Sequence, residues 1–397
     1  MTRRTAHALV AFFVTIVVAL AMPREVLAVD SNFAGSAQID YHFVPTAKGA
    51  NARASAFDGF TLEASGKMAV DFSPRLSANL KVCYGCHGFE TDMAYFDYRV
   101  ADELGFRLGR FSPSFGSFNI RHDPGNHRLS DKPLPYDMGR MLRLRGWNMG
   151  VLPSPFPDNG FEIGGKVAMG DSSSIDYAAY AVSGFKGSAR GLDLDFVQSR
   201  DGNAYYVDNN GRPTVGGRLA LNVTMSPSSE ATLGASLMRG TYDPANDFSY
   251  TIMGGDLNLR LGRTNLRFEY LVRRQDFDTS DPTLFKYNVV ANGNFNVKHG
   301  AYAEVETPIW EGVDVIARVD GMLHVGNVLA TPAGAPEPVD GQLAGRSFVA
   351  RSTLGTAVSL ERNLRAKASA ELWQFSDRDA TGATTALGIH IAAVGTF

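Results

Sequence analysis

Apolar and polar residues alternate along several stretches of this chain. From Phe60 to Phe72, the apolar side chains and Gly66 stand at even positions, and the odd positions are mostly polar. The same two-residue period recurs at 37–43 and 364–372. Because successive side chains of a strand point to opposite faces, this period predicts strands with one apolar and one polar face. The first stretch is longer than the ~5 to 6 residues of a typical strand and fits a tilted membrane-spanning strand.

Repeated over the whole chain, this pattern predicts about sixteen strands, an even number as bacterial outer-membrane barrels have. We place them near residues 35–44, 60–72, 75–83, 90–100, 103–111, 161–169, 174–183, 213–225, 230–240, 249–260, 263–275, 296–309, 313–325, 346–359, 363–376 and 383–397.

The connections between these strands alternate in length. Tight turns, such as Ser73-Pro74 and Glu361-Arg362, alternate with longer links, of which 112–160 is the longest. Short turns on one side and long loops on the other are typical of outer-membrane barrels, and a soluble sandwich gives no reason for them. The expected fold class is therefore all-β: a closed transmembrane antiparallel β-barrel of about 16 strands with a long inward-folding loop. Closure removes the unpaired sheet edges, and ~16 strands leave an aqueous channel.

Both ends of the chain agree with export to a bacterial outer membrane. Arg3 and Arg4 precede an apolar run, and Val26-Leu27-Ala28 resembles a cleavage site, which predicts a cleaved signal peptide over 1–28 and a mature barrel over 29–397. The alternative is an uncleaved transmembrane anchor, although the run is shorter than the ~20 residues that a span needs. The last residue, Phe397, ends an alternating stretch that resembles the terminal strand signal of outer-membrane barrels.

Composition excludes several classes of protein. The chain is 44% hydrophobic and 20% charged, which fits neither a disordered chain nor a helical membrane protein. Its net charge of -3 gives no basic excess that would point to nucleic acid. We find no spacing typical of a catalytic triad, an acidic pair or a phosphate-binding loop, and we expect no enzyme. The tryptophans Trp147, Trp310 and Trp373 suit aromatic girdles. We expect His299, His324 and His390, which are isolated on alternating strands, to be lumen or rim residues.

One passage resembles a known family. The stretch FRLGRFSPSFGSF, Phe106 to Phe118, ends a predicted strand in a Gly-basic-Phe pattern and then turns at Pro and Phe-Gly. It resembles the strand-to-loop passage of the phosphate-selective porins, as the upstream FDGFTLEASGKMAVDFSP resembles their early strand. The resemblance implies a sixteen-stranded, often homotrimeric porin in outer-membrane lipid that prefers small anionic solutes.

The longest loop is rich in cations. In general porins such a loop folds into the lumen and sets the constriction, and a ring of Arg and Lys there favours anions. A solvated surface loop with scattered charges is the alternative. The candidate pore-lining residues are Arg121, Arg128, Lys132, Arg140, Arg143 and Arg145.

The chain's only two cysteines form a C-x-x-C-H motif, Cys83, Cys86 and His87, at the tip of a predicted hairpin. Three interpretations stay open. The motif is the attachment site of a c-type haem, with thioethers at the cysteines and His87 as an axial ligand. Alternatively the cysteines form a short disulfide, as expected in an oxidising periplasm, or part of a metal site. For the haem, the loop offers His122, His127, Met138 and Met141 as a sixth ligand.

Two functions of different classes follow. The first is a passive porin for small, anionic solutes. The second is a porin-cytochrome, similar in plan to the porin-cytochrome fusions of iron-oxidising bacteria, in which one covalent haem c passes electrons between periplasmic and extracellular carriers. In those fusions the cytochrome segment precedes the barrel, whereas here the motif lies inside it.

Overall fold

The computed structural model describes residues 30–44, 59–85, 88–137, 150–154, 156–187, 196, 199, 207–277, 287–289, 295–326, 328–332, 346–375 and 384–397. The predicted signal peptide, 1–28, lies outside the described residues. Among the described residues, no helix is long and apolar enough to cross a bilayer.

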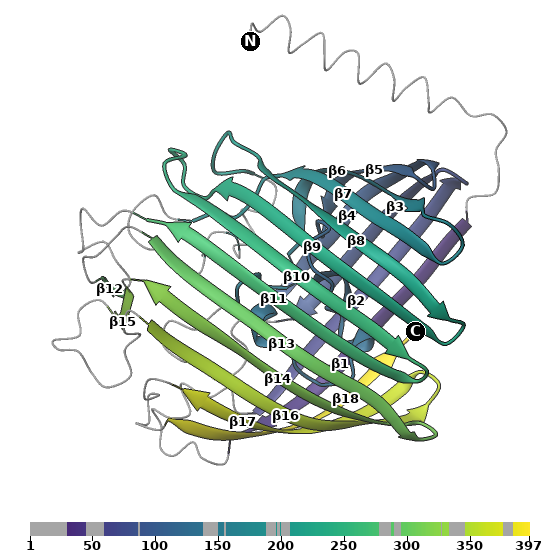
Figure 1. Cartoon of the computed structure of the whole chain (residues 1–397), viewed down its shortest axis with the longest axis vertical. Helices are drawn as coiled ribbons and strands as arrows, with labels where there is room; N and C mark the ends of the chain where they lie inside the picture. Colours follow the sequence, from purple (N-terminus) through teal and green to yellow (C-terminus); the bar gives the residue numbers. More distant parts are fainter. Residues whose placement is uncertain are drawn as a thin grey trace, which may run out of the picture.

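Sixteen antiparallel strands close into one barrel, as predicted (Figure 1). The strands of this barrel are β1 (Asp30–Phe43), β2 (Gly59–Ser73), β3 (Leu76–Gly85), β4 (Gly88–Ala101), β5 (Leu104–Phe111), β6 (Asp158–Ala168), β7 (Ser173–Val182), β8 (Thr214–Ser226), β9 (Ser229–Thr241), β10 (Ser249–Leu261), β11 (Thr264–Asp276), β13 (Phe295–Trp310), β14 (Val313–Gly326), β16 (Arg346–Glu361), β17 (Leu364–Phe375) and β18 (Thr385–Thr396).

Three short 3-10 helices and a small separate sheet complete the described structure. The sheet, which the sequence pattern did not predict, pairs β12 (Tyr287–Val289) with β15 (Val328–Pro332). The helices lie in the connection between β5 and β6: η1 (Asn119–Arg121), η2 (Pro124–Asn126) and η3 (Leu134–Tyr136).

Burial distinguishes the membrane barrel from a soluble sandwich. On β16, Leu354 points outward and is 62% exposed, whereas Arg351 points inward and is 1% exposed. The same arrangement, with apolar side chains exposed and polar ones buried, is found on β1, where Ile39 is exposed and Asp40 is buried. A soluble domain buries its apolar side chains and exposes its charges. The opposite arrangement requires an apolar surrounding medium, as in a barrel whose outer face contacts lipid.

Tight turns connect the strands at one end of the barrel, where β1 begins and β18 ends (Figure 1). We call this end the short-turn side and the other end the long-loop side. On the long-loop side the connection from β5 to β6 is the longest one between barrel strands, as predicted. The pairing Gly85↔Gly88 joins β3 to β4 on the same side as a tight hairpin.

The barrel closes between its first and last strands. The amide of Gly35 donates to the carbonyl of Phe397 at 3.0 Å, and the amide of Phe397 donates back to Gly35 at 3.1 Å. A Cβ on Gly35 would lie 2.3 Å from the Phe397 ring and 2.6 Å from the carbonyl oxygen of Ser65. Glycine is therefore required where the terminal aromatic ring crosses β1.

Two expectations about single residues were wrong. Trp373 does not belong to an outer girdle: it lies inside the barrel, 2% exposed, and its indole N–H donates to Glu371 at 2.9 Å. Its position on the polar face of β17 explains this. His390 is not isolated, because the pairing of β1 with β18 sets it directly opposite His42. Trp147 lies outside the described residues.

Replacing Gly35 with valine should weaken closure of the barrel, because the new side chain meets both the Phe397 ring and the backbone of β2. Overpacking of this kind typically costs about 1–3 kcal/mol. We expect a lower temperature for loss of the compact, heat-modifiable form on semi-native gels. Ala37→Val, at an exposed outward position of the same strand, is the matched control. Equal melting of the two variants would contradict the proposed role of Gly35.

Candidate functional site

Residues 112–137, in the connection between β5 and β6, fold into the barrel, and we call them the inward loop. Its first attachment to the wall is Asp131. Arg318 on β14 donates to Asp131 at 2.5 Å, and Arg351 on β16 donates to the same carboxylate oxygen. Arg351 also donates to Asp320 through Nε at 2.9 Å and to the carbonyl of Lys132 at 2.8 Å. The loop therefore supplies the carboxylate that two buried wall arginines share.

Burial alone would raise the pKa of Asp131, but the guanidinium groups of Arg318 and Arg351 hold it well below its usual range. The carboxylate is thus charged at any physiological pH. Removing one partner of such a buried network is strongly destabilising, because the remaining charges are left uncompensated.

A second attachment joins the loop to β17 and β1. The Lys367 ammonium donates to the carbonyls of Pro124 and Leu129 at 2.8 and 3.0 Å and to the amide oxygen of Gln38 at 2.9 Å. The amide group of Gln38 donates in turn to the carbonyl of Ser130 at 2.8 Å. These contacts satisfy backbone carbonyls of a segment that has no regular strand partner.

A third attachment lies on the opposite wall, at Glu269 of β11. Its carboxylate accepts from the backbone amide of Ser117 at 2.8 Å, from the hydroxyl of Tyr302 at 3.1 Å, and from the hydroxyl of Tyr136. Gly116 makes this approach possible: its φ is +62°, and a Cβ there would lie 2.2 Å from Glu269 Oε1. Burial, followed by the charge of Glu269, raises the pKa of Tyr136 well above its usual value.

An apolar cluster inside the barrel packs beside this third attachment. The inward loop contributes Phe115, Phe118 and Tyr136. Strands β7, β9, β10, β11 and β13 contribute the inward-facing Tyr180, Val182, Met238, Tyr250, Ile252, Leu271 and Tyr302. The inward loop is thus held by ion pairs to β14 and β16 on one wall and by aromatic packing against β7 to β13 on the other. Its position across the barrel divides the lumen.

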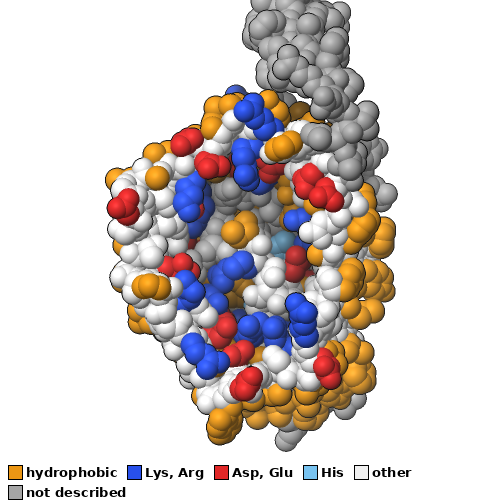
Figure 2. Space-filling model, turned by 90° about the vertical axis from the view of Figure 1, so that its right-hand side faces the viewer, with side chains coloured by type: hydrophobic (Ala, Val, Ile, Leu, Met, Phe, Trp, Pro, Cys, Tyr) orange, Lys and Arg blue, Asp and Glu red, His pale blue; other side chains and the backbone are white. Residues whose placement is uncertain are grey.

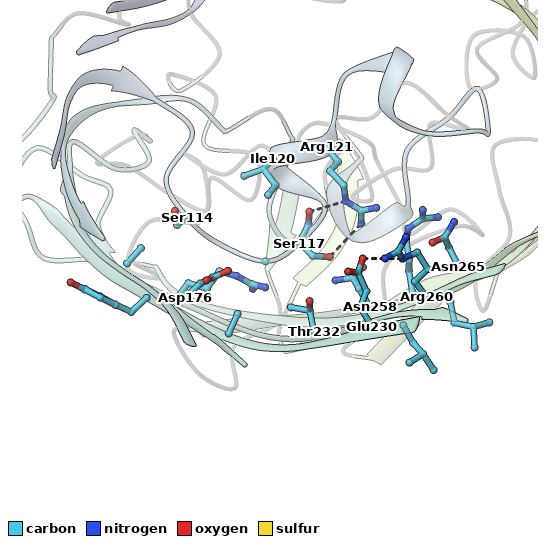
Figure 3. Close-up of a pocket in the computed structure, with 18 residues that line it drawn as sticks. Ser114, Ser117, Ile120, Arg121, Asp176, Glu230, Thr232, Asn258, Arg260 and Asn265 are labelled. Carbon is cyan, nitrogen blue, oxygen red and sulfur yellow. Dashed lines mark hydrogen bonds and ion pairs between the residues drawn. The ribbon is translucent and has the colours of Figure 1, made fainter. Parts of the chain in front are cut away.

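A cavity of about 450 Å³ remains between the inward loop and strands β7 to β11. From the short-turn side the barrel is visibly hollowed, and Lys and Arg side chains gather around the hollow (Figure 2). The close-up shows Ile120 and Arg121 entering from the loop, opposite side chains that rise from the wall (Figure 3). The charged residues that line this cavity are Arg121, Arg218, Arg260, Arg267, Asp176 and Glu230.

Most of these cations are paired. Arg218 forms an ion pair with Asp256, Arg260 pairs with Glu230 at 3.1 Å, and Arg267 contacts Glu304 and Glu306 at 2.9 and 2.7 Å. Arg121 differs. It donates to the carbonyl and hydroxyl oxygens of Ser117 at 3.2 and 3.5 Å, and within the described part of the chain it has no ion pair.

The structure places the predicted pore-lining cations in different surroundings. Arg121 lines the cavity. Arg128 donates to Asp314 at 3.0 Å, and Lys132 is 8% exposed and donates to the carbonyl of Ser154 at 3.0 Å. The other three, Arg140, Arg143 and Arg145, lie outside the described residues, as do Met138 and Met141.

Sequence reasoning did not single out the wall arginines Arg218, Arg260 and Arg267. Each stands on the polar face of an alternating strand, so the two-residue period could have found them. The pattern does not tell which polar positions along a strand lie beside open space, because this depends on the path of the inward loop.

Only some of the residues that could bind a haem are among the described residues. Cys83 lies half-buried on the inner face of β3, two residues after Lys81, whereas Cys86 and His87 lie outside the described residues. Lys81 donates to His122 at 2.9 Å and pairs with Asp92 and Asp123 at 2.7 and 2.6 Å. His122 also donates through Nδ1 to the carbonyl of Asn119 at 2.6 Å. Both nitrogens of His122 are therefore engaged within this cluster.

His127 has other neighbours. Its Nδ1 donates to the carbonyl of Leu129 at 2.8 Å, and its ring packs against Phe118. Burial, together with the charges of Lys367 and Lys132, lowers its pKa well below the usual value. The structure thus connects His122 with the strand that carries Cys83, and it places His127 near β17.

The fold matches known outer-membrane proteins, among them a porin and a channel. An anion-selective porin from Comamonas acidovorans is 12% identical, with a TM-score of 0.56, over 93% of this chain and 100% of that chain. The outer membrane channel DcaP of Acinetobacter baumannii is 10% identical, with a TM-score of 0.52, over 93% and 97%. The trimer form of OmpT, an outer membrane protein of Vibrio cholerae, is 11% identical, with a TM-score of 0.52, over 94% and 100%.

No protein-family model matches the chain, and no curated protein matches it at a significant level. The resemblance to phosphate-selective porins therefore stays a prediction. At these identities the structural matches establish the porin fold and leave the solute open.

Asp131→Asn should release the inward loop, because Arg318 and Arg351 would lose the charge that they share. Loss of a partner from a buried pair costs about 3–5 kcal/mol. We expect a lower melting temperature and a larger, noisier single-channel conductance in planar bilayers. Asp171→Asn, at an exposed position in a tight turn, removes the same charge elsewhere. Unchanged conductance and melting in Asp131→Asn would contradict the anchoring role.

The same attachment predicts a pH dependence. Because the folded-state pKa of Asp131 is depressed, its contribution to stability is complete above the unfolded value of about 3.9 and declines as the pH falls below it. We expect the difference in stability between wild type and Asp131→Asn to stay constant from neutral pH to about pH 4 and to shrink only in stronger acid. A difference that already shrinks near pH 6 would contradict this assignment.

Proposed function

We propose that this protein is a bacterial outer-membrane porin that conducts small solutes and prefers anions. The observation that carries the proposal is the cavity between the inward loop and strands β7 to β11. Four arginines and two carboxylates line it. A barrel of ~16 strands is wide enough for an aqueous channel, and the inward loop narrows it enough for its charges to act on a passing ion.

The charge distribution supports the preference for anions. Asp256, Glu304 and Glu306 balance arginines from the wall side of the cavity, while Arg121 projects from the loop. Arg121 has no carboxylate partner among the described residues, and such a cation beside the path of a solute lowers the electrostatic barrier for a negative charge. The C. acidovorans protein with the same fold is an anion-selective porin, which agrees with this proposal.

The likeness to a trimeric outer membrane protein supports a homotrimer in outer-membrane lipid. We include this assembly in the proposal. Chemical cross-linking of the purified protein in detergent is expected to give a band at three times the mass of the single chain.

The C-x-x-C-H motif favours a second candidate function, electron transfer by a covalent haem c at Cys83, Cys86 and His87. Cys83 lies on the inner face of β3, next to the tight hairpin on the long-loop side. His122 would need to give up its contacts with Lys81 and Asn119 to serve as a sixth ligand. A haem would supply one-electron chemistry, and periplasmic and extracellular carriers would be its partners. A disulfide between the cysteines is the competing outcome.

Arg121→Ala should reduce the preference for anions, because it removes the loop cation that faces the cavity. In a wet, salt-screened lumen we expect the chloride-to-potassium permeability ratio to fall roughly 2- to 3-fold. A tenfold change would correspond to ~1.4 kcal/mol, and salt screening keeps the effect of one charge below that. Reversal potentials in a KCl gradient measure this ratio. Arg362→Ala, at an exposed position in the turn between β16 and β17, is the charge-matched control. Cation selectivity of the wild-type channel would overturn the anion proposal.

The second candidate has its own test. Purified protein with a covalent haem should give a pyridine haemochrome absorbance of about one haem per chain, lost in Cys83→Ala. No absorbance, together with a protein mass two hydrogens below that of the reduced chain, would leave a disulfide and the porin function alone. Expression should include the host's cytochrome c maturation system, so that a negative result is informative.

A further inference from the structure

Two histidines and a glutamate meet at the seam where the barrel closes. His42 on β1 pairs in register with His390 on β18, and Glu371 on β17 pairs with Gly388, two residues before His390. All three side chains are buried inside the barrel. One ligand atom from each lies within 4.8 Å of the others, a grouping that brings residues 42 and 390 together from opposite ends of the chain.

We propose that His42, His390 and Glu371 bind a divalent transition-metal ion of the zinc class, which links the first strand of the barrel to the last two. Two imidazoles and one carboxylate are a common protein ligand set for zinc, with water as a fourth ligand. The proposal is independent of the solute that the channel conducts.

The distances fit such an ion. Oε2 of Glu371 lies 3.4 Å from Nε2 of His390. In a tetrahedral site with bonds of ~2.0 to 2.2 Å, neighbouring ligand atoms lie roughly 3.3 Å apart. By contrast, a charge-assisted hydrogen bond between such groups is shorter, at ~2.7 to 2.9 Å. The observed separation is therefore closer to that of two ligands of one ion than to that of a direct bond.

Gly388 leaves room beside these atoms. A Cβ at Gly388 would lie 3.2 Å from Nε2 of His42 and 3.2 Å from Oε2 of Glu371. The two imidazole rings are stacked, with centroids 3.9 Å apart and an angle of 15° between their planes. They must tilt to direct both lone pairs at one ion, and the missing side chain at Gly388 provides space for this movement.

Groups behind the ligands are placed to orient them. Oδ1 of Asp40 lies 3.4 Å from Nδ1 of His390, on the side of the ring away from Glu371. Carboxylates in this position fix the orientation of metal-bound histidines and increase their basicity. Glu371 is held by Arg351, which donates to Oε1 at 3.1 Å, and by the indole N–H of Trp373, which donates to Oε2 at 2.9 Å.

Charge also favours a cation here. Arg351 divides its charge among Asp131, Asp320 and Glu371, and Arg318 pairs with Asp131 and with Asp320. Oε2 of Glu371 and Oδ1 of Asp40 instead face the ring of His390 from two sides. Arg351 pairs with Oε1 of Glu371 at 3.1 Å, but it is shared with two other carboxylates, so Oε2 of Glu371 and Asp40 leave room for one more positive charge, which either a metal ion or a protonated His390 would provide. These two outcomes are what the experiment separates.

The test measures Zn²⁺ bound by the purified, tag-free, full-length barrel. Because the site is buried, the protein is refolded in detergent with and without Zn²⁺, passed over a desalting column, and analysed for metal. We expect about one retained zinc per chain and a higher temperature for loss of the heat-modifiable form. Both effects should be lost in His42→Gln and His390→Gln. Asp40→Asn should weaken binding by ~10- to 100-fold, as for other partners of metal-bound histidines.

Gly388→Ala gives the sharpest variant, since it keeps every ligand and fills the space between His42 and Glu371. It should abolish zinc retention, while Gly395→Ala, where the nearest atom is 4.0 Å from the new Cβ, should not. His299→Gln, at a partly exposed histidine paired with Tyr270, is the histidine control. A Cys83→Ser/Cys86→Ser variant excludes binding by the cysteine motif.

Two results would overturn the proposal. Wild-type protein that retains no more zinc than the His42→Gln/His390→Gln double variant would leave only an ion pair between protonated His390 and its two carboxylates. Zinc retention that is lost in Cys83→Ser/Cys86→Ser and kept in Gly388→Ala would assign the metal to the cysteine motif instead. Conductance and ion selectivity do not enter either result, so the porin function is tested separately.

Discussion

The structure depends on the requirement that a polypeptide in a bilayer pair its own backbone polar groups. A sheet meets this requirement only by closing, and here closure extends to the last residue, through the two hydrogen bonds between Gly35 and Phe397. Closure sends one face of every strand to lipid and the other into an enclosed space. Charged side chains such as Arg351 and Glu269 are thereby buried, although they lie on what would be the solvent face of an ordinary sheet.

Buried charges need partners, and this need shapes the interior. Arg318 and Arg351 stand close together on neighbouring strands, and Asp131 of the inward loop supplies the carboxylate between them. On the far wall, Glu269 accepts hydrogen bonds from the loop backbone and from two tyrosines. The loop is thus held by the charges that the barrel encloses. The cavity left on one side of it has walls of fixed charge.

The seam between β1 and β18 is where the barrel closes, because it pairs the first strand with the last. It joins strands that are far apart in the sequence, so its pairing carries a larger loop-closure entropy than the pairing of neighbouring strands. The cluster of His42, His390 and Glu371 lies across it, on the inner face, and Phe397 packs across it on the outer face. Contacts at this position stabilise the closed form directly, because opening the seam breaks them.

The sequence by itself determined the barrel, the number of its strands and the face on which each side chain stands, because a two-residue period and turn lengths are local properties of the chain. It also indicated that the link after β5 folds inward. Only the tertiary structure decided how the charges are used. Arg121 and Lys132 lie eleven residues apart in one loop, yet the first lines a cavity and the second is buried against a carbonyl group. Trp373 and His390 were misjudged for different reasons. Trp373 stands on the polar face of β17, beside its partner Glu371 on the same strand, so the two-residue period already placed it inside the barrel. The partner of His390 is His42 on β1, and only strand pairing brings these two residues together.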